Sequence, residues 1–335
     1  MSLRLIEIIV PTDAASPLAE LPESDDVLGR WSSLLDDDRT LVRILVSAER
    51  SEELLDRLES WFSRVDGFRV MLLPVEATLP RPEEPAQETT AEQKPSPQRI
   101  SREELYHDIA GGAQTSRVFI ASVILSTLVA AVGLMRDDTA IIIGAMVIAP
   151  LLGPNVSLCL ATTLGDRVLA VQSLKANAMG LAVALMASLL LGLAFPVDIS
   201  LASISSRTQV SGGDIILALA SGCAGVLAFT TGASSALIGV MVAVALLPPT
   251  VVFGLLLASG QIDSASGALL LVGTNMICVN LAGVLTFTVQ GLRPRALWEA
   301  ERAKKATRWA VVTWTLLLAI LIGLIFLASR SSAGT

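Results

Sequence analysis

Two segments of this chain, 95 residues apart, carry the same apolar motif with a proline inside it. Residues 143–156 and 238–251 both fit the pattern I-G-x-M-V-x-x-x-L-L-x-P-x-V, and both lie within long apolar stretches. Proline has no backbone N–H and its ring clashes with the preceding turn, so it interrupts a helix. A duplicated, proline-broken apolar helix is typical of membrane proteins built from internal repeats, whose broken helices form a site near mid-bilayer.

The composition indicates a membrane protein that carries a soluble N-terminal part. Of 335 residues, 53% are hydrophobic and 16% are charged, whereas soluble domains carry about 25% charged residues. Residues 1–98 hold 20 acidic and 10 basic residues, a net charge of −10, while residues 139–290 hold only seven charged residues. Because no clustered basic face is visible, we expect no nucleic-acid partner.

Residues 1–79 are predicted to form a small cytoplasmic α+β domain. A well-marked helix is expected to begin with Ser51 as its cap, and a weaker helical pattern covers residues 25–35. Strands interleaved with two helices favour a ferredoxin-like arrangement. No signal peptide is visible, so this domain is expected to stay in the cytoplasm. Alternating apolar residues predict strands at 3–10, 40–47 and 68–75.

The remaining chain divides into a linker, a short helix and a membrane domain. Residues 80–98 contain five prolines and few apolar residues, which predicts a disordered acidic linker. Residues 99–116 are predicted to form a juxtamembrane helix. A six-span domain over 117–289 is followed by a basic cytoplasmic loop at 290–308, and by a seventh span and tail at 309–335. At about 20 residues per span, we expect spans at 117–134, 139–160, 170–195, 213–231, 233–257, 265–289 and 309–328.

The first six spans form two groups of three, and the middle helix of each group contains one copy of the motif. Because each group has an odd number of spans, the second copy enters the membrane from the opposite face. The sequence therefore predicts a multi-span α-helical membrane protein with an inverted 3+3 helix repeat, one extra C-terminal span and the small cytoplasmic domain in front.

Positive charges in the short loops predict the orientation. The loop between spans six and seven lies on the same side as the N-terminal domain, and the opposite side carries few basic residues. We therefore expect a multi-pass protein of the bacterial plasma (inner) membrane with a cytoplasmic N-terminal domain and the C-terminus outside. The basic residues of that loop are Arg293, Arg295, Arg302, Lys304, Lys305 and Arg308.

The two broken helices, spans two and five, are predicted to form a polar site. Helix interruptions leave backbone groups without partners, and such groups are tolerated only against protein or a wet cavity. Helix amide ends would favour an anion there, and freed carbonyls a cation. Two other interpretations remain open: the prolines are packing kinks, and the polar side chains only join helices by hydrogen bonds. The predicted site residues are Pro150, Gly153, Pro154, Asn155, Asn177, Ser234, Pro248, Pro249, Thr250, Asn275 and Asn280.

The sequence does not favour enzyme chemistry, a cofactor or a metal centre. His107 is the only histidine and precedes the first span, so it cannot form a Ser-His pair or a metal–histidine cluster within the membrane. Cys159, Cys223 and Cys278 lie in apolar segments without metal-ligand spacing. We expect a protein that is not an enzyme.

Several segments are similar to those of a known membrane family. The motif I-G-A-M-V-I-A-P-L-L-G-P at 143–154 and A-L-L-P-P at 245–249, with segments 70–80 and 101–106, closely resemble the bacterial and archaeal family catalogued as "domain of unknown function 389". The resemblance covers essentially the whole chain. It implies a cytoplasmic domain followed by a multi-span hydrophobic domain, and it implies no substrate.

The sequence thus predicts a transporter or channel-like protein for a small polar solute or ion. Its cytoplasmic domain would regulate or oligomerise it. The expected partners are the lipid bilayer, the solute and further copies of this chain. The alternative is a non-transporting receptor or scaffold whose cytoplasmic domain binds a metabolite or a protein.

Overall fold

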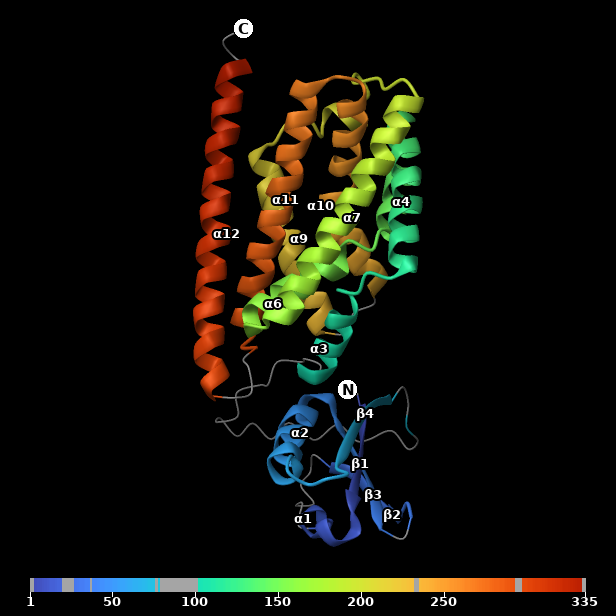
Figure 1. Ribbon diagram of the computed structural model, residues 1–335, viewed down its shortest axis with the longest axis vertical. Coiled ribbons are helices and arrows are strands. Elements are labelled where there is room, and N and C mark those ends of the chain that lie inside the picture. The colour runs from blue at the N-terminus through green and yellow to red at the C-terminus, as the bar shows by residue number, and fades with distance from the viewer. Residues whose placement is uncertain are drawn as a thin grey trace. The chain divides into compact units, whose positions relative to one another are not determined.

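The structure is a computed structural model that describes residues 3–19, 27–36, 38–75, 78, 102–231, 235–292 and 297–332. The chain divides into two compact units, Met1–Leu105 and Tyr106–Thr335. The first unit is a small α+β domain and the second is helical (Figure 1). The predicted linker at 80–98 lies outside the described residues.

The N-terminal unit contains a four-stranded antiparallel sheet with the strand order β2-β3-β1-β4. The chain order strand, helix, strand, strand, helix, strand is that of a ferredoxin-like domain, although the first helix spans only four residues. The elements are β1 (Leu3–Pro11), a 3-10 turn (Thr12–Ala14), α1 (Ser16–Ala19), β2 (Val27–Leu34), β3 (Arg39–Ser47), α2 (Ala48–Phe62) and β4 (Arg69–Val75).

One face of this sheet is covered and forms the core of the unit. Alternate residues of the central strands point to the same face, and Ile6, Ile8 and Ile44 are almost completely buried there. Leu58 and Phe62 of α2 belong to the same buried cluster. The apolar alternation that predicts the strands therefore has its cause in this helix-on-sheet contact.

Two sequence predictions for this unit are wrong. Residues 27–34 form strand β2, not a helix. β2 is an edge strand whose side chains are mostly exposed, so no burial imposes an apolar alternation on its sequence. The residue at the N-terminal end of α2 is Ser47, not Ser51, because Ser51 lies inside the helix and its hydroxyl donates to the Ala48 carbonyl at 2.7 Å.

The second unit begins within α3 and consists mainly of long apolar helices. Among the described residues, α4, α7, α9 and α11 are each long and apolar enough to cross a membrane, and the pair α5 and α6 passes the same test together. Described apolar segments of 10–17 residues lie in α10 and α12. The helices are α3 (Arg102–Gly111), α4 (Arg117–Met135), α5 (Thr139–Ile148), α6 (Leu152–Leu164), α7 (Arg167–Ala194), α8 (Ala202–Ser205), α9 (Gly212–Thr230), α10 (Ser235–Ala258), α11 (Ile262–Val289) and α12 (Leu297–Ser332).

Helices are found at all seven predicted span positions, but some boundaries differ. The predicted helix at 99–116 is α3, which ends at Gly111. The predicted loop at 290–308 is helical from Leu297 onward, because α12 extends through the basic segment before its apolar part. The four membrane-length helices, or five with the bent pair, make this a membrane-type fold. The count of seven crossings and the inverted repeat stay predictions.

The first motif copy bends the chain, and Pro150 explains the bend. The helix axis bends by 53° between α5 and α6, at a short break in the helix. A residue before proline is pushed out of the helical region, and Ala149 is indeed extended, with φ −69° and ψ 119°. Pro154 lies in the first turn of α6, where a helix needs no N–H partner.

The second motif copy does not break its helix, so the predicted sharp break at Pro248 and Pro249 is wrong. Both prolines lie inside the continuous helix α10. Ala245 stands where the first copy has Pro150, so the residue that causes the bend is missing. The hydroxyl of Thr250, directly after the two prolines, donates to the Leu246 carbonyl of the same helix at 2.7 Å.

Candidate functional site

Three asparagines from three helices meet inside the helical unit. Asn155 of α6, Asn177 of α7 and Asn280 of α11 are all at most 2% exposed. The Nδ2 of Asn155 donates to the Oδ1 of Asn177 at 2.8 Å, and the Nδ2 of Asn280 donates to the Oδ1 of Asn155 at 3.2 Å. We call these three residues the asparagine cluster.

Backbone carbonyls satisfy the remaining donors of two of these side chains. The Nδ2 of Asn155 also donates to the Leu151 carbonyl at 2.8 Å, and the Nδ2 of Asn280 to the Met276 carbonyl at 2.8 Å. An amide nitrogen has two hydrogens, so both nitrogens are fully used. Among the described residues, by contrast, no acceptor forms a hydrogen bond with the Asn177 Nδ2.

A buried amide nitrogen without a hydrogen-bond partner lowers the stability of the fold, so its presence requires an explanation. Leaving a buried donor unsatisfied costs about 1–3 kcal/mol, and buried polar groups without partners are rare in native structures. The opposite orientation of the Asn177 amide would place its nitrogen against the Asn155 nitrogen, so the network fixes the orientation. The Asn177 Nδ2 is therefore the donor through which the cluster can bind the acceptor atom of a ligand.

The cluster lies well inside the helices and not at their ends. At 1.5 Å per residue, Asn177 lies about 15 Å from the start of α7, and Asn280 about 14 Å from the end of α11. The start of α7 and the end of α11 lie on the same side of the helical unit. α7 starts where α6 ends, and α12 follows the end of α11. The hydroxyl of Thr307 in α12 donates to the Thr163 carbonyl at the end of α6. In a hydrocarbon core of about 30 Å, the cluster would lie near the middle.

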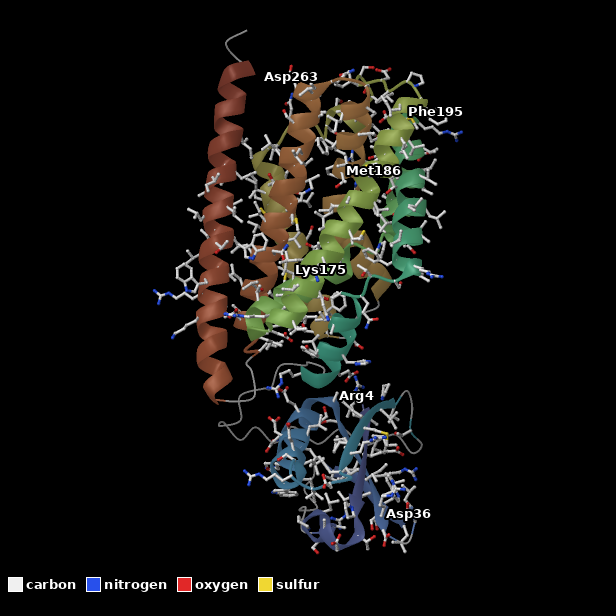
Figure 2. The ribbon with its side chains drawn as sticks, in the orientation of Figure 1. Arg4, Asp36, Lys175, Met186, Phe195 and Asp263 are labelled. Carbon is white, nitrogen blue, oxygen red and sulfur yellow. The ribbon has the colours of Figure 1, made fainter. Side chains whose placement is uncertain are left out.

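The outer face of α7 differs from the face that carries Asn177. Lys175, Met186 and Phe195 mark the course of α7 in Figure 2, and all three side chains are exposed. Lys175 is two residues from Asn177, about 200° around the helix axis. Its ammonium therefore points away from the cluster, and α7 presents an uncharged face to the inside.

The helix that carries Asn155 is fixed at its first turn by a glycine contact. A Cβ added to Gly153 would lie 2.9 Å from the Cα of Gly112, and one added to Gly112 would lie 2.8 Å from the Cα of Gly153. The hydroxyl of Ser157 donates to the Ile109 carbonyl. Gly153 therefore allows the close approach of two backbones.

The other predicted site residues do not join the cluster. Thr250 uses its hydroxyl on its own helix. Asn275 is buried on α11, but five residues place it about 140° around the axis from Asn280. Ser234 lies outside the described residues, whereas Pro248 and Pro249 lie within α10. The two motif copies nevertheless share one apolar core, which includes Ala149, Leu151, Leu246, Leu247 and Val251.

Cys159 is a neighbour of the cluster that the sequence pattern did not identify. Its Sγ lies 3.5 Å from the Asn280 Oδ1, so the thiol can donate a weak hydrogen bond to this oxygen. A Cβ on Gly283 would lie 2.5 Å from the same sulfur. Its spacing of four residues from Asn155, which places both on one face of α6, is the signal that could have found it.

A second polar contact outside the apolar core joins Tyr106 to Asp166. The Tyr106 hydroxyl donates to one carboxylate oxygen of Asp166 at 2.7 Å. The other oxygen caps α7 by accepting from the N–H groups of Val168 and Leu169 at 2.9 and 3.0 Å. Burial, together with the neighbouring carboxylate, raises the pKa of Tyr106 to about 12. Asp166 therefore ties the start of α7 to α3.

Asp137, which follows α4, makes a comparable contact with the first turn of α8. Its carboxylate accepts from the Ser203 N–H at 2.7 Å, and this hydrogen bonding lowers the pKa of Asp137. Burial lowers the pKa of Arg207, which donates to the Ser203 carbonyl at 2.6 Å. Among the described residues, no group of three or more His, Cys, Asp or Glu side chains is arranged to hold a metal ion.

The asparagine cluster and both prolines of the second motif lie within a region that matches a known family. Residues 146–281 match the model described as "Domain of unknown function (DUF389)". The chain is 36% identical over 328 residues to an uncharacterised protein of Methanocaldococcus jannaschii, a match that covers 97% of this chain and 100% of that protein. No solved structure matches. On this full-length similarity, the chain belongs to the DUF389 family.

Proposed function

We propose that this protein is a transporter or channel-like membrane protein for a small polar solute or ion, and that the asparagine cluster binds the solute. The observation that carries the proposal is the Asn177 Nδ2, a buried amide nitrogen without an acceptor beside a broken helix. Polar groups at mid-membrane depth are expensive, and in membrane proteins they mark solute or ion pathways.

The directions of the helices support an inverted repeat. α7 and α10 run in the same direction, since Ser188 contacts Gly254 and a Cβ on Gly192 would lie 2.7 Å from the Ala258 Cβ four residues further along both helices. α6 and α7 run in opposite directions, because a two-residue turn joins them and the bond from Asn155 crosses between them. α6 and α10, which carry the two motif copies, therefore run in opposite directions, as an inverted repeat requires.

The ends of the two motif helices are also alike. Gly165 after α6 and Gly260 after α10 are 95 residues apart and both left-handed, with φ of 73° and 75°. The next residue donates its N–H to the carbonyl five residues earlier in both copies, at 2.8 Å from Asp166 and 3.0 Å from Gln261. This is the Schellman pattern of helix termination, and it follows the repeat of the motif.

The surface of the helical unit supports a lipid environment. Exposed side chains on α7 and α9 include Met186, Leu190, Leu193, Ile216 and Leu217. A soluble protein rarely exposes such continuous apolar faces. We infer a membrane-embedded protein with a cytoplasmic N-terminal domain, as the basic residues of 290–308 predict.

Solute permeation into liposomes that contain the purified full-length chain tests this proposal. The probes are urea, glycerol and the chloride, nitrate and gluconate salts of sodium and potassium, each followed by osmotic swelling. We expect at least one probe to enter faster than into empty liposomes. The change Asn177→Leu, which keeps the branched shape and removes the amide, should slow that entry by roughly tenfold, the factor carried by one strong hydrogen bond.

Thr274→Val is the matched control, because it removes a buried hydroxyl of α11 whose one hydrogen bond among the described residues is to the Leu270 carbonyl of its own helix. This variant should keep the wild-type permeation rate. Equal swelling of liposomes with and without the protein for every probe, or an unchanged rate in Asn177→Leu, would contradict the proposal.

A receptor or scaffold is the second candidate, and the open face of the N-terminal sheet favours it. Leu5 pairs with Leu45 and Leu73 in one row of this face, Leu73 is 41% exposed and Trp31 is 54% exposed. This apolar face could bind a second copy of the chain. If it does, Trp31→Ser with Leu73→Ser should reduce the number of chains per particle of the full-length protein in detergent, measured by light scattering.

A further inference from the structure

The hydrogen bonds of the asparagine cluster all run in the same direction, and this direction determines what kind of ligand the cluster can bind. Asn280 donates to Asn155, and Asn155 donates to Asn177. Each amide oxygen of the series is engaged by a donor, with the Cys159 thiol beside the Asn280 oxygen at 3.5 Å. The series therefore ends in the two hydrogens of the Asn177 nitrogen, which have no acceptor among the described residues.

Cooperative polarisation makes this terminal nitrogen a stronger donor than an isolated amide. Successive hydrogen bonds in the same sense polarise one another, and the effect is larger where the local dielectric constant is low. Asn177 is 2% exposed and Asn155 is 1% exposed, so water screens neither of them. The cluster is consequently electropositive at the Asn177 end.

The start of α6 adds to this positive potential. α6 begins at Leu152, three residues before Asn155, and no side chain caps its first turn. The N-terminal end of a helix carries a partial positive charge and favours anions. Gly180 lies about one turn after Asn177 on α7. A Cβ added to Gly180 would lie 2.7 Å from the Leu151 Cδ2, so α7 packs directly against the bend.

The described charges of the membrane helices do not favour a cation at this position. Within α9 and α11, the described carboxylates are Asp214 and Asp263, and both lie in the first turn of their helices, far from the cluster. Divalent cation sites such as those of calcium use several oxygens, often with carboxylates. The cluster instead offers a free N–H donor.

We propose that the cluster binds a small monovalent anion, such as chloride, bromide or nitrate, through the Asn177 amide. The proposal rests on the proposed function, since it names the class of solute that the same site takes. The anion accepts a hydrogen bond from the Asn177 Nδ2 and lies in the positive potential of the cluster. No Asp or Glu is among the described residues that are buried, so no buried carboxylate competes with the anion.

Thermal unfolding of the full-length protein in detergent tests the anion directly. The probes are sodium chloride, bromide and nitrate, each substituted for sodium gluconate at constant ionic strength, and the same series with potassium. We expect the unfolding temperature to rise with saturation for the small anions and to be the same for both cations. The concentration for half of the rise should increase by at least about tenfold in Asn177→Leu, the factor of one charged hydrogen bond.

Two further variants keep the test decisive if Asn177→Leu does not fold. Asn177→Ser retains a hydroxyl donor and should bind the same anions more weakly, while Thr274→Val should bind them as the wild type does. A rise that differs between sodium and potassium, a rise unaffected by Asn177 variants, or no rise with any anion would each overturn the anion proposal.

The two proposals can fail separately. Saturable anion binding that depends on Asn177, without permeation into liposomes, would support the anion site and contradict transport. Permeation of a neutral solute or a cation that depends on Asn177, without any anion effect on unfolding, would support transport and contradict the anion site.

Discussion

Asn155 and Thr250 occupy equivalent positions of the two motif copies, and each donates a hydrogen bond to the equivalent backbone carbonyl. Asn155 donates to the Leu151 carbonyl at 2.8 Å, and Thr250 donates to the Leu246 carbonyl at 2.7 Å. Asparagine has a second N–H and an oxygen left for other helices, whereas the hydroxyl of Thr250 has used its only hydrogen. Both copies therefore make the same hydrogen bond from a side chain to a backbone carbonyl, whereas the asparagine cluster is formed around the first copy.

Pro150→Ala should reduce the 53° bend between α5 and α6. Without the proline ring, Ala149 is free to adopt the helical conformation, and α5 can continue into α6. The distance between spin labels at the exposed positions Ile143 and Val168, measured by electron–electron double resonance in a cysteine-free background, should increase.

Pro154→Ala is the matched control for the bend. Pro154 lies in the first turn of α6, where the N–H has no helical partner, so the label distance should remain that of the wild type. An unchanged distance in Pro150→Ala, or an equal change in both variants, would show that Pro150 does not cause the bend.

Gly153→Ala should destabilise the helical unit by about 1–3 kcal/mol, the usual cost of forcing a methyl group into a packed contact. Its Cβ would lie 2.9 Å from the Cα and from the carbonyl oxygen of Gly112, and backbone atoms cannot move aside as a flexible side chain can. The free energy of unfolding can be measured by dodecyl sulfate titration in mixed micelles.

Gly144→Ala tests whether that loss comes from the contact. Nothing lies within 4 Å of a Cβ at Gly144 in α5, so alanine should stabilise this helix by about 0.5–1 kcal/mol through its higher helix propensity. A similar loss in both variants would assign the effect to the substitution of glycine in general.

Tyr106 should ionise only near pH 12. It is the sole tyrosine of the chain, so the tyrosinate absorbance of the full-length protein reports this residue alone. Burial first, and then the hydrogen bond and charge of Asp166, raise its pKa from the usual 10 to about 12. Asp166→Asn should move the titration midpoint towards 10 without reaching it, because the effect of burial remains.

The same pKa gives the pH dependence of stability. The folded protein holds the Tyr106 proton more tightly than the unfolded chain, so the stabilisation is fully present below pH 10 and is lost as the pH rises through about 12. A Tyr106→Phe variant should lack this alkaline loss. A wild-type midpoint near 10 would contradict both the burial of the Tyr106 hydroxyl and its contact with Asp166.

The sequence predicts those parts of the fold that burial imposes on the residue pattern. Apolar length locates the long helices, and alternation locates β1, β3 and β4. The exposed edge strand β2 carries no such pattern, and its strand conformation depends on pairing with β3, for example Trp31 opposite Arg43. Only the three-dimensional fold supplies that information.

The candidate site could be predicted only in part, for reasons of geometry. Asn155, Asn177 and Asn280 are recognisable as polar residues within apolar spans, and the structure brings them together. Whether such a residue faces the cluster depends on its position around the helix, which excludes Asn275 although it lies only five residues from Asn280. The effect of the prolines likewise depends on one position, since Ala245 replaces Pro150 in the second copy.

The most direct measurement of the central claim is the anomalous difference density of bromide in crystals of the full-length protein. The account predicts a bromide peak within hydrogen-bond distance of the Asn177 Nδ2 in the wild type and no peak in Asn177→Leu. A wild-type map with no anomalous peak beside Asn177, or with the same peak in the variant, would contradict it.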